Sequence, residues 1–151
     1  MDKEKILKIV KNAQSDINHM LENAKLIHEG VGLQFKSIPK DPKECEFGKW
    51  FYTEGQKLKT LSNNPMECLQ NIELLHQEFH KTYYEIIELY EKSQSKGGLL
   101  KMFSKKEELP KEEMEQLLQK LEYSHEKLLG ELVKMERRIQ ATPQEKFNML
   151  S

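Results

Sequence analysis

Long apolar runs are missing from this sequence. Nowhere do about 18 consecutive apolar residues occur, which is the length that a membrane-spanning helix needs. Charged residues also interrupt the apolar positions between Met1 and Lys11, unlike the apolar core of a secretory signal. We therefore expect no membrane span, no secretory signal and a cytoplasmic location.

Cysteine is scarce, and neither sign of charge is in excess. The two cysteines, Cys45 and Cys68, are expected to stay reduced in such a chain, so we predict no structural disulfide. The 24 Lys and Arg residues are interleaved with 25 Asp and Glu residues, for a net charge of −1, and this balance does not favour nucleic acid binding. Glycine-rich phosphate loops, serine nucleophile elbows and supported carboxylate pairs are missing too, so we expect no enzyme.

Apolar residues that recur every three or four positions are the main signal present, and they predict an all-α fold. Strand patterns and internal repeats are absent, and 151 residues suit one core, so we expect a single domain over 1–151. The economical architecture is an antiparallel four-helix bundle with a short second helix. A charged linker over 95–109 has no assigned role. The predicted helices cover about 3–29, 42–62, 65–94 and 110–140.

His76 and His80 are the first residues that indicate chemistry. They are four positions apart on the apolar stripe of the third predicted helix, so both imidazoles project from one face about one turn apart. This is a common way to present two ligands to one metal ion. The alternative is a pair of core histidines satisfied by hydrogen bonds, because buried imidazoles need partners.

Cys45 favours the metal site. Asp41, Pro42 and Glu44 are typical of a helix start, which places Cys45 in the first turn of the second helix. About 17 residues separate Cys45 from the turn near residue 62 and about 16 separate that turn from His80, or roughly 25 and 24 Å of helix. Cys45 is therefore predicted to lie level with His80. Thiolate and imidazole suit tetrahedral zinc, which needs a fourth ligand; a small buried hydrophobe is the alternative for Cys45.

These motifs resemble a known family. The run Cys45-Glu46-Phe47-Gly48-Lys49-Trp50, followed by His76-x-x-x-His80, is similar to the core motif of the chemoreceptor zinc-binding domain, usually called CZB. The family's first ligand is a histidine on the opening helix, and Ile17-Asn18-His19 resembles that part. The resemblance spans roughly residues 19 to 90 and implies one zinc per chain, held by His19, Cys45, His76 and His80.

The first-helix ligand has two candidates. The helical wheel favours His28, which lies on the apolar stripe, whereas His19 lies off it. The family's spacing favours His19, which precedes Cys45 by 26 positions. Water is the fallback fourth ligand.

Three neighbours of Cys45 have predicted roles of their own. Gly48 is expected to admit a neighbouring helix, because it carries no side chain on the face of Cys45. Phe47 and Trp50 are expected to shield the metal from water, or to serve as ordinary core residues.

The resemblance also implies a function. Domains of this family regulate chemoreceptors and diguanylate cyclases of bacteria, and they sense zinc itself or hypochlorous acid through the zinc-bound cysteine. We therefore expect a signal-transduction module with Cys45 as its redox switch, a protein partner from a chemotaxis or cyclic-di-GMP system, and a homodimer formed through the helices.

Two other classes of protein stay open at this point. A hemerythrin-like di-iron bundle would also be helical with a His-x-x-x-His pair, but it would need His28 and His125 as ligands, together with bridging carboxylates. A helical interaction protein without metal is the other alternative.

Overall fold

The computed structural model describes residues 1–31, 38–61, 69–95 and 110–150. All regular structure in these ranges is helical, which confirms the all-α prediction. The predicted linker over 95–109 and the predicted start of the third helix lie outside the described residues, apart from Ser95. The elements are α1 (Lys3–His28), α2 (Glu46–Phe51), the 3-10 helix η1 (Glu54–Thr60), α3 (Leu69–Ser95), α5 (Lys111–Ala141) and α6 (Gln144–Asn148).

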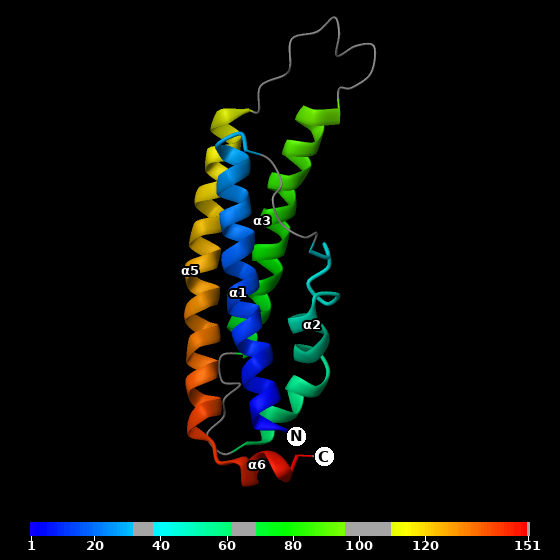
Figure 1. Cartoon of the computed structure of the whole chain (residues 1–151), viewed down its shortest axis with the longest axis vertical. Coiled ribbons are helices and arrows are strands. Elements are labelled where there is room, and N and C mark those ends of the chain that lie inside the picture. The colour runs from blue at the N-terminus through cyan, green and yellow to red at the C-terminus, as the bar shows by residue number, and fades with distance from the viewer. Residues whose placement is uncertain (32–37, 62–68, 96–109, 151) are drawn as a thin grey trace, which may run out of the picture.

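Among the described residues the long helices α1, α3 and α5 form the body of the structure (Figure 1). Helix α5 packs against both α1 and α3, and the short α2 packs against α1. In Figure 1, α1 and α3 run in one direction along the long axis, whereas α2 and α5 run in the other. The predicted antiparallel helical bundle is therefore present, with a fourth member much shorter than the other three.

The second helix is shorter than the predicted 42–62. The Asp41 side chain accepts the N–H of Lys43 at 2.9 Å and its carbonyl accepts the N–H of Glu44 at 2.9 Å, so the expected helix start forms a separate turn. Cys45 is extended, and α2 begins only after it. Thr53, with φ −121° and ψ −97°, then separates α2 from η1.

The core follows the apolar stripes that the sequence predicts. Each long helix places one stripe inward, because residues three and four apart share a face. Burial of these side chains is the main stabilising contribution to the bundle. The buried positions of α1 include Ile6, Val10, Ala13, Ile17, Met20, Ala24 and Ile27, and those of α5 include Leu121, Leu128, Leu132 and Met135.

Helix α6 closes the end of the bundle at which the chain begins (Figure 1). Its Phe147 is fully buried. The Gln144 side chain accepts the N–H of Lys3 at 3.1 Å and donates to the carbonyl of Met1 at 3.0 Å. These contacts fix the start of α1.

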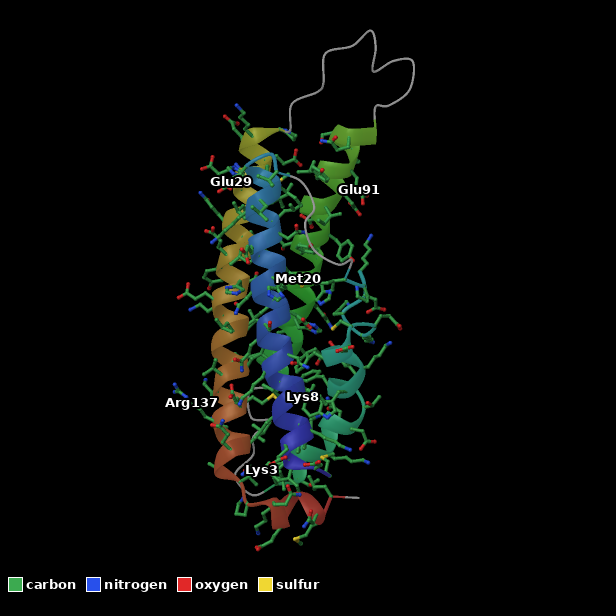
Figure 2. All side chains as sticks on the ribbon, in the orientation of Figure 1. Lys3, Lys8, Met20, Glu29, Glu91 and Arg137 are labelled. Carbon is green, nitrogen blue, oxygen red and sulfur yellow. The ribbon has the colours of Figure 1, made fainter. Side chains whose placement is uncertain are left out.

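Charged side chains cover the outside of the helices. Lys8, Glu91 and Arg137 are exposed, and the Arg137 side chain projects away from the bundle (Figure 2). Within the part of the chain that the structure describes, every helix is too short or too polar to traverse a lipid bilayer.

Candidate metal centre

Cys45, His76 and His80 converge inside the bundle. Cys45 immediately precedes α2, and both histidines lie on the inner face of α3. Their donor atoms all lie within 4.8 Å of one another. The histidines are almost fully buried, at 3% and 2% exposure, so the convergence that the sequence predicts is present.

Cys45 is positioned by two backbone contacts. It is the N-cap of α2, and its Sγ accepts the N–H of Gly48 at 3.3 Å. The thiol in turn donates to the carbonyl oxygen of Pro42 at 3.1 Å. A thiol at an N-cap satisfies one of the otherwise unpaired N–H groups of a helix start, as a serine or aspartate would.

Gly48 allows the Pro42 carbonyl to lie this close. A Cβ at position 48 would overlap with the Pro42 carbonyl oxygen and would lie 3.0 Å from the Cα of Lys43. The group that approaches Gly48 is therefore the backbone of the preceding turn, and not the neighbouring helix that the sequence suggested. The reason is that the chain folds back on itself before α2, where a continuous helix was expected.

The two imidazoles have different partners. His80 Nδ1 donates to the carbonyl of Pro39 at 3.2 Å, so its Nε2 carries the lone pair that a metal requires. His76 Nε2 lies 3.4 Å from Cys45 Sγ. His76 Nδ1 is buried without a hydrogen-bond partner among the described residues. An unpartnered polar atom in such a site is costly.

Burial keeps all three donors uncharged in the absence of metal. It raises the pKa of the Cys45 thiol; the Gly48 N–H opposes this shift, and the negative charge of Asp16 adds to it. Burial, together with neighbouring His80, lowers the pKa of His76 to about 3. Burial also lowers the pKa of His80. Neutral imidazoles bind metal directly, whereas the thiol must first lose its proton.

Cys45 is predicted to lie level with His80, with His76 one turn away. In the structure the Cys45 Sγ lies 3.4 Å from His76 Nε2, and the three donor atoms all lie within 4.8 Å of one another. The prediction assumes continuous α-helix from Cys45 to residue 62, whereas the chain passes through a six-residue helix, a break at Thr53 and a 3-10 helix.

A small chamber of about 30 Å³ lies between these ligands and α1. Phe47 is buried, lines this chamber and sets its ring perpendicular to that of His76, with ring centroids 5.4 Å apart. Trp50 is half-buried and packs on Phe47 at 5.9 Å without lining the chamber. Phe47 thus separates the donors from water, and Trp50 supports it.

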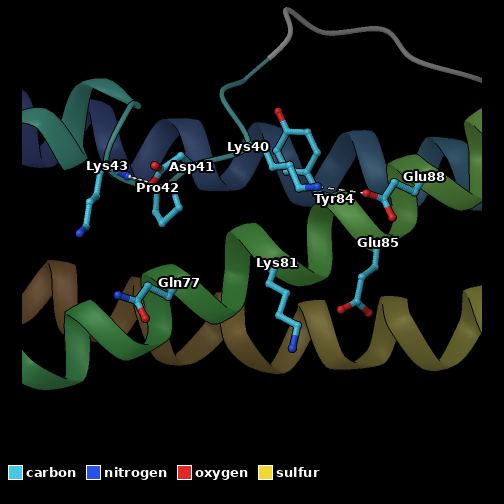
Figure 3. A pocket seen from close by; sticks show the side chains of 9 residues that line it. All are labelled: Lys40, Asp41, Pro42, Lys43, Gln77, Lys81, Tyr84, Glu85 and Glu88. Carbon is cyan, nitrogen blue, oxygen red and sulfur yellow. Dashed lines mark hydrogen bonds and ion pairs between the residues drawn. The ribbon is translucent and has the colours of Figure 1, made fainter.

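The segment between residues 39 and 45 forms a strap that runs beside α3, with α1 behind it in the view of Figure 3. A hollow of about 520 Å³ lies between the strap and α3. Lys40 and Glu88 both line it and form an ion pair at 3.3 Å. Lysines and carboxylates line this hollow in equal number, so it has no charge preference for a ligand. Since the strap also carries the Pro39 and Pro42 carbonyls, it positions both His80 and Cys45.

The other histidines do not join the three donors. His19 and His28 are exposed, and neither belongs to the compact group nor lines the chamber. His125 Nε2 lies 2.7 Å from Asn18 Oδ1 at the surface between α1 and α5. All five histidines lie in the described ranges, so the ligand set of a di-iron centre is not assembled here. His19 as the fourth ligand stays a prediction.

The structure also brings in residues that the sequence did not single out. Asp16 of α1 lines the chamber together with Ala13, Ile17 and Met20. A carboxylate at the edge of an apolar helical stripe was the available signal for it. The carbonyls of Pro39 and Pro42 left no signal, because the sequence does not show where a backbone oxygen points. Cys45 is a free thiol, whereas Cys68 lies outside the described residues and the predicted lack of a disulfide stays a prediction.

Comparison with known proteins agrees with this geometry. The family model of the chemoreceptor zinc-binding domain (CZB) matches residues 10–87, a little more than half of the chain, and this range contains all three converging donors. No curated protein and no solved structure matches the chain. The helical bundle, the Cys–His–His cluster and the family match together show that this chain belongs to the chemoreceptor zinc-binding domain family.

Proposed function

We propose that this chain is a zinc-binding sensory module in which the zinc-bound sulfur of Cys45 is the group that responds to the signal. The observation that carries the proposal is the convergence of one thiol and two buried imidazoles within 4.8 Å, in a chain of the chemoreceptor zinc-binding family.

Zinc is the metal that these donors fit best. Thiolate sulfur combined with imidazole nitrogen selects zinc over magnesium or calcium, which prefer oxygen. The His80 side chain is oriented by the Pro39 carbonyl, as metal-bound histidines usually are by a second partner. A fourth ligand comes from α1 or from water.

The centre is proposed to be sensory and not catalytic. A chamber of about 30 Å³ has room for an ion or for one water molecule. A substrate beside the metal would need far more space, since small-molecule sites usually measure about 300 Å³ or more. The chain is therefore proposed to signal through its own conformation.

The chemical change that carries the signal is proposed to take place at the sulfur of Cys45. Zinc bound by these residues holds the sulfur as a thiolate. With hypochlorous acid as oxidant, the thiolate gains the hydroxyl group and becomes a sulfenic acid, while chlorine leaves as chloride. Sulfur loses two electrons in this step, and chlorine accepts them.

Helix α2 is the element that such a change would affect. Cys45 caps the six-residue helix through the Gly48 N–H, and modification of the sulfur alters the cap as well as the metal ligand. Phe47 and Phe51 hold the rest of α2 to the core. A short helix with few anchors is the part of a bundle most easily displaced.

The output is proposed to pass to a protein partner. The candidate partners belong to chemoreceptor or diguanylate cyclase systems, as for other members of the family. The chain is proposed to present α2 to such a partner as a homodimer. Zinc itself is the alternative signal, through the same ligands.

A pair of substitutions at Cys45 tests the proposal. Serine can replace the cap but is a poor zinc ligand, whereas alanine removes both functions. We expect about one zinc per wild-type chain by elemental analysis, and loss of zinc in Cys45→Ser and Cys45→Ala. Zinc-free Cys45→Ser should keep the helicity of the zinc-free wild type. Hypochlorous acid should release zinc only from the wild type.

Cys68→Ser provides the control, because it removes the chain's other cysteine, which the proposal does not make a zinc ligand. That variant should bind zinc and respond to oxidant as the wild type does. Retention of zinc by Cys45→Ser, two irons per chain, or a wild type that holds no metal after gentle isolation would each overturn the proposed function.

A further inference from the structure

We propose that the buried hydrogen bond between Asn23 of α1 and Tyr83 of α3 is a positioning contact, which holds α1 against the metal centre and slows the loss of zinc. This inference rests on the proposed zinc centre and concerns only what keeps its α1 side closed.

The hydrogen bond links the two helices that line opposite sides of the chamber. The Asn23 amide donates to the Tyr83 hydroxyl at 2.7 Å, and the two residues are 1% and 5% exposed. Met20 belongs to the α1 wall of the chamber, and His80 belongs to its α3 wall. Since α1 packs more extensively on α5 than on α3, a specific contact between α1 and α3 has a large share in fixing their relative position.

The hydrogen bond lies about one turn beyond the chamber on both helices. Asn23 follows Met20 by three residues, and Tyr83 follows His80 by three residues. Because α1 and α3 run in the same direction (Figure 1), each step advances by about 4.5 Å toward the same end of the bundle. The contact is therefore close enough to set the separation and rotation of α1 where it faces the metal donors.

Such a pair contributes more to specificity than to stability. Replacement of both partners of a buried hydrogen bond by apolar groups of similar shape is often nearly neutral for stability. Apolar contacts are not directional, so a helix that is held by them alone is freer to turn or slide. A hydrogen bond is directional and favours one arrangement, as a single buried asparagine does in coiled coils.

The Tyr83 ring has a packing partner of its own, which allows its hydroxyl to be tested separately. It lies perpendicular to the ring of Tyr84, with ring centroids 5.7 Å apart. Tyr84 in turn lines the hollow beside the strap. Tyr83→Phe keeps the ring and removes only the hydroxyl that accepts the hydrogen bond from Asn23.

The rate of zinc release from full-length proteins tests this inference. Zinc transfer to an excess of chromophoric chelator would be followed for wild type, Tyr83→Phe and the double variant Asn23→Leu/Tyr83→Phe. Release should be about threefold to tenfold faster in both variants, within the range for coupled neighbouring residues. The double variant should keep a melting temperature close to that of the wild type, because both partners become apolar together. Its faster release would then not follow from lost stability.

Phe147→Leu is the matched control for a purely structural effect. Phe147 is fully buried where α6 closes the bundle, and it does not line the chamber. Its truncation should lower the melting temperature, because it leaves unfilled space in the core. Zinc release from this variant should stay within about twofold of the wild-type rate.

Two results would overturn the positioning role and leave the zinc centre intact. One is zinc release at the wild-type rate in the double variant, and the other is an equal acceleration in Phe147→Leu. A wild type that binds no zinc would instead remove the centre itself, so the two failures are distinguishable.

Discussion

At the scale of single residues, burial selects the chemistry of the site. His76 and His80 are almost inaccessible to solvent, and an imidazolium there would lose its hydration. The folded protein therefore keeps both rings neutral. The same burial raises the pKa of Cys45, so the thiolate needs a metal ion to form near neutral pH.

The zinc-free protein should lose stability as the pH falls below about 6.5. Unfolded His76 takes up a proton near pH 6.5, while the folded residue does so only near pH 3. The unfolded state therefore binds more protons between these values, and the stability present above pH 6.5 is lost on acidification. We expect His76 to account for about 1.4 kcal/mol of unfolding free energy between pH 7.5 and 5.5, measured by urea denaturation in chelator.

His76→Asn is the control for this measurement, because it cannot titrate. Its unfolding free energy should fall less over the same pH range. Parallel pH profiles for wild type and variant would show that His76 does not titrate as its burial requires.

At the scale of elements, the strap and α2 act together. The Pro42 carbonyl lies against Gly48 and accepts a hydrogen bond from Cys45, while the Pro39 carbonyl orients His80. The geometry of the metal donors thus depends on a close backbone approach between the strap and the first turn of α2. There is no room for a Cβ at Gly48, so one added methyl group would disturb that approach.

Gly48→Ala should weaken both zinc binding and stability. The added Cβ overlaps with the Pro42 carbonyl oxygen, so the strap must move away from Cys45. We expect a loss of about 1–3 kcal/mol in unfolding free energy, as for other overpacked sites, and a weaker zinc affinity by chelator competition.

Gly130→Ala is the matched control in α5. A Cβ there meets nothing within 4 Å, so the change should stabilise the helix by about 0.4–1 kcal/mol and leave zinc affinity unchanged. Equal zinc affinity in Gly48→Ala and Gly130→Ala would contradict the proposed dependence on the strap.

At the scale of the whole molecule, the metal site and the main core are separable. The stripes of α1, α3 and α5 form a continuous hydrophobic cluster, with α6 closing one end through the buried Phe147. Small zinc fingers lack such a core and unfold without metal. This bundle has a continuous apolar core, so we expect it to fold without metal, and we expect the candidate metal site to connect the short α2 to that framework.

Removal of zinc should therefore loosen α2 and η1 without unfolding the bundle. We expect chelator to leave the far-ultraviolet circular dichroism nearly unchanged and to lower the melting temperature, because zinc stabilises the folded state that binds it. Hydrogen exchange read by mass spectrometry should accelerate over 46–60 and stay slow in the middle of α1 and α5. Collapse of the helical signal on chelation would show that the core does not fold alone.

Much of this architecture could be read from the sequence. The spacing of apolar residues determined α1 and α5 to within about one residue of their observed ends. The four-residue spacing of His76 and His80, with Cys45 in the first turn of the predicted second helix, was enough to predict their convergence. These features are local periodicities, and a helix converts them directly into a shared face.

Tertiary structure alone decided the remainder. The break of the second helix at Thr53, the contact of Cys45 with His76, and the strap carbonyls at Pro39 and Pro42 depend on how the chain folds back on itself. The same is true of which α1 residue faces the chamber, because a small rotation of a packed helix exchanges Asp16 for its neighbours. Sequence periodicity fixes the composition of a helical face, whereas packing against the other helices fixes the direction in which that face points.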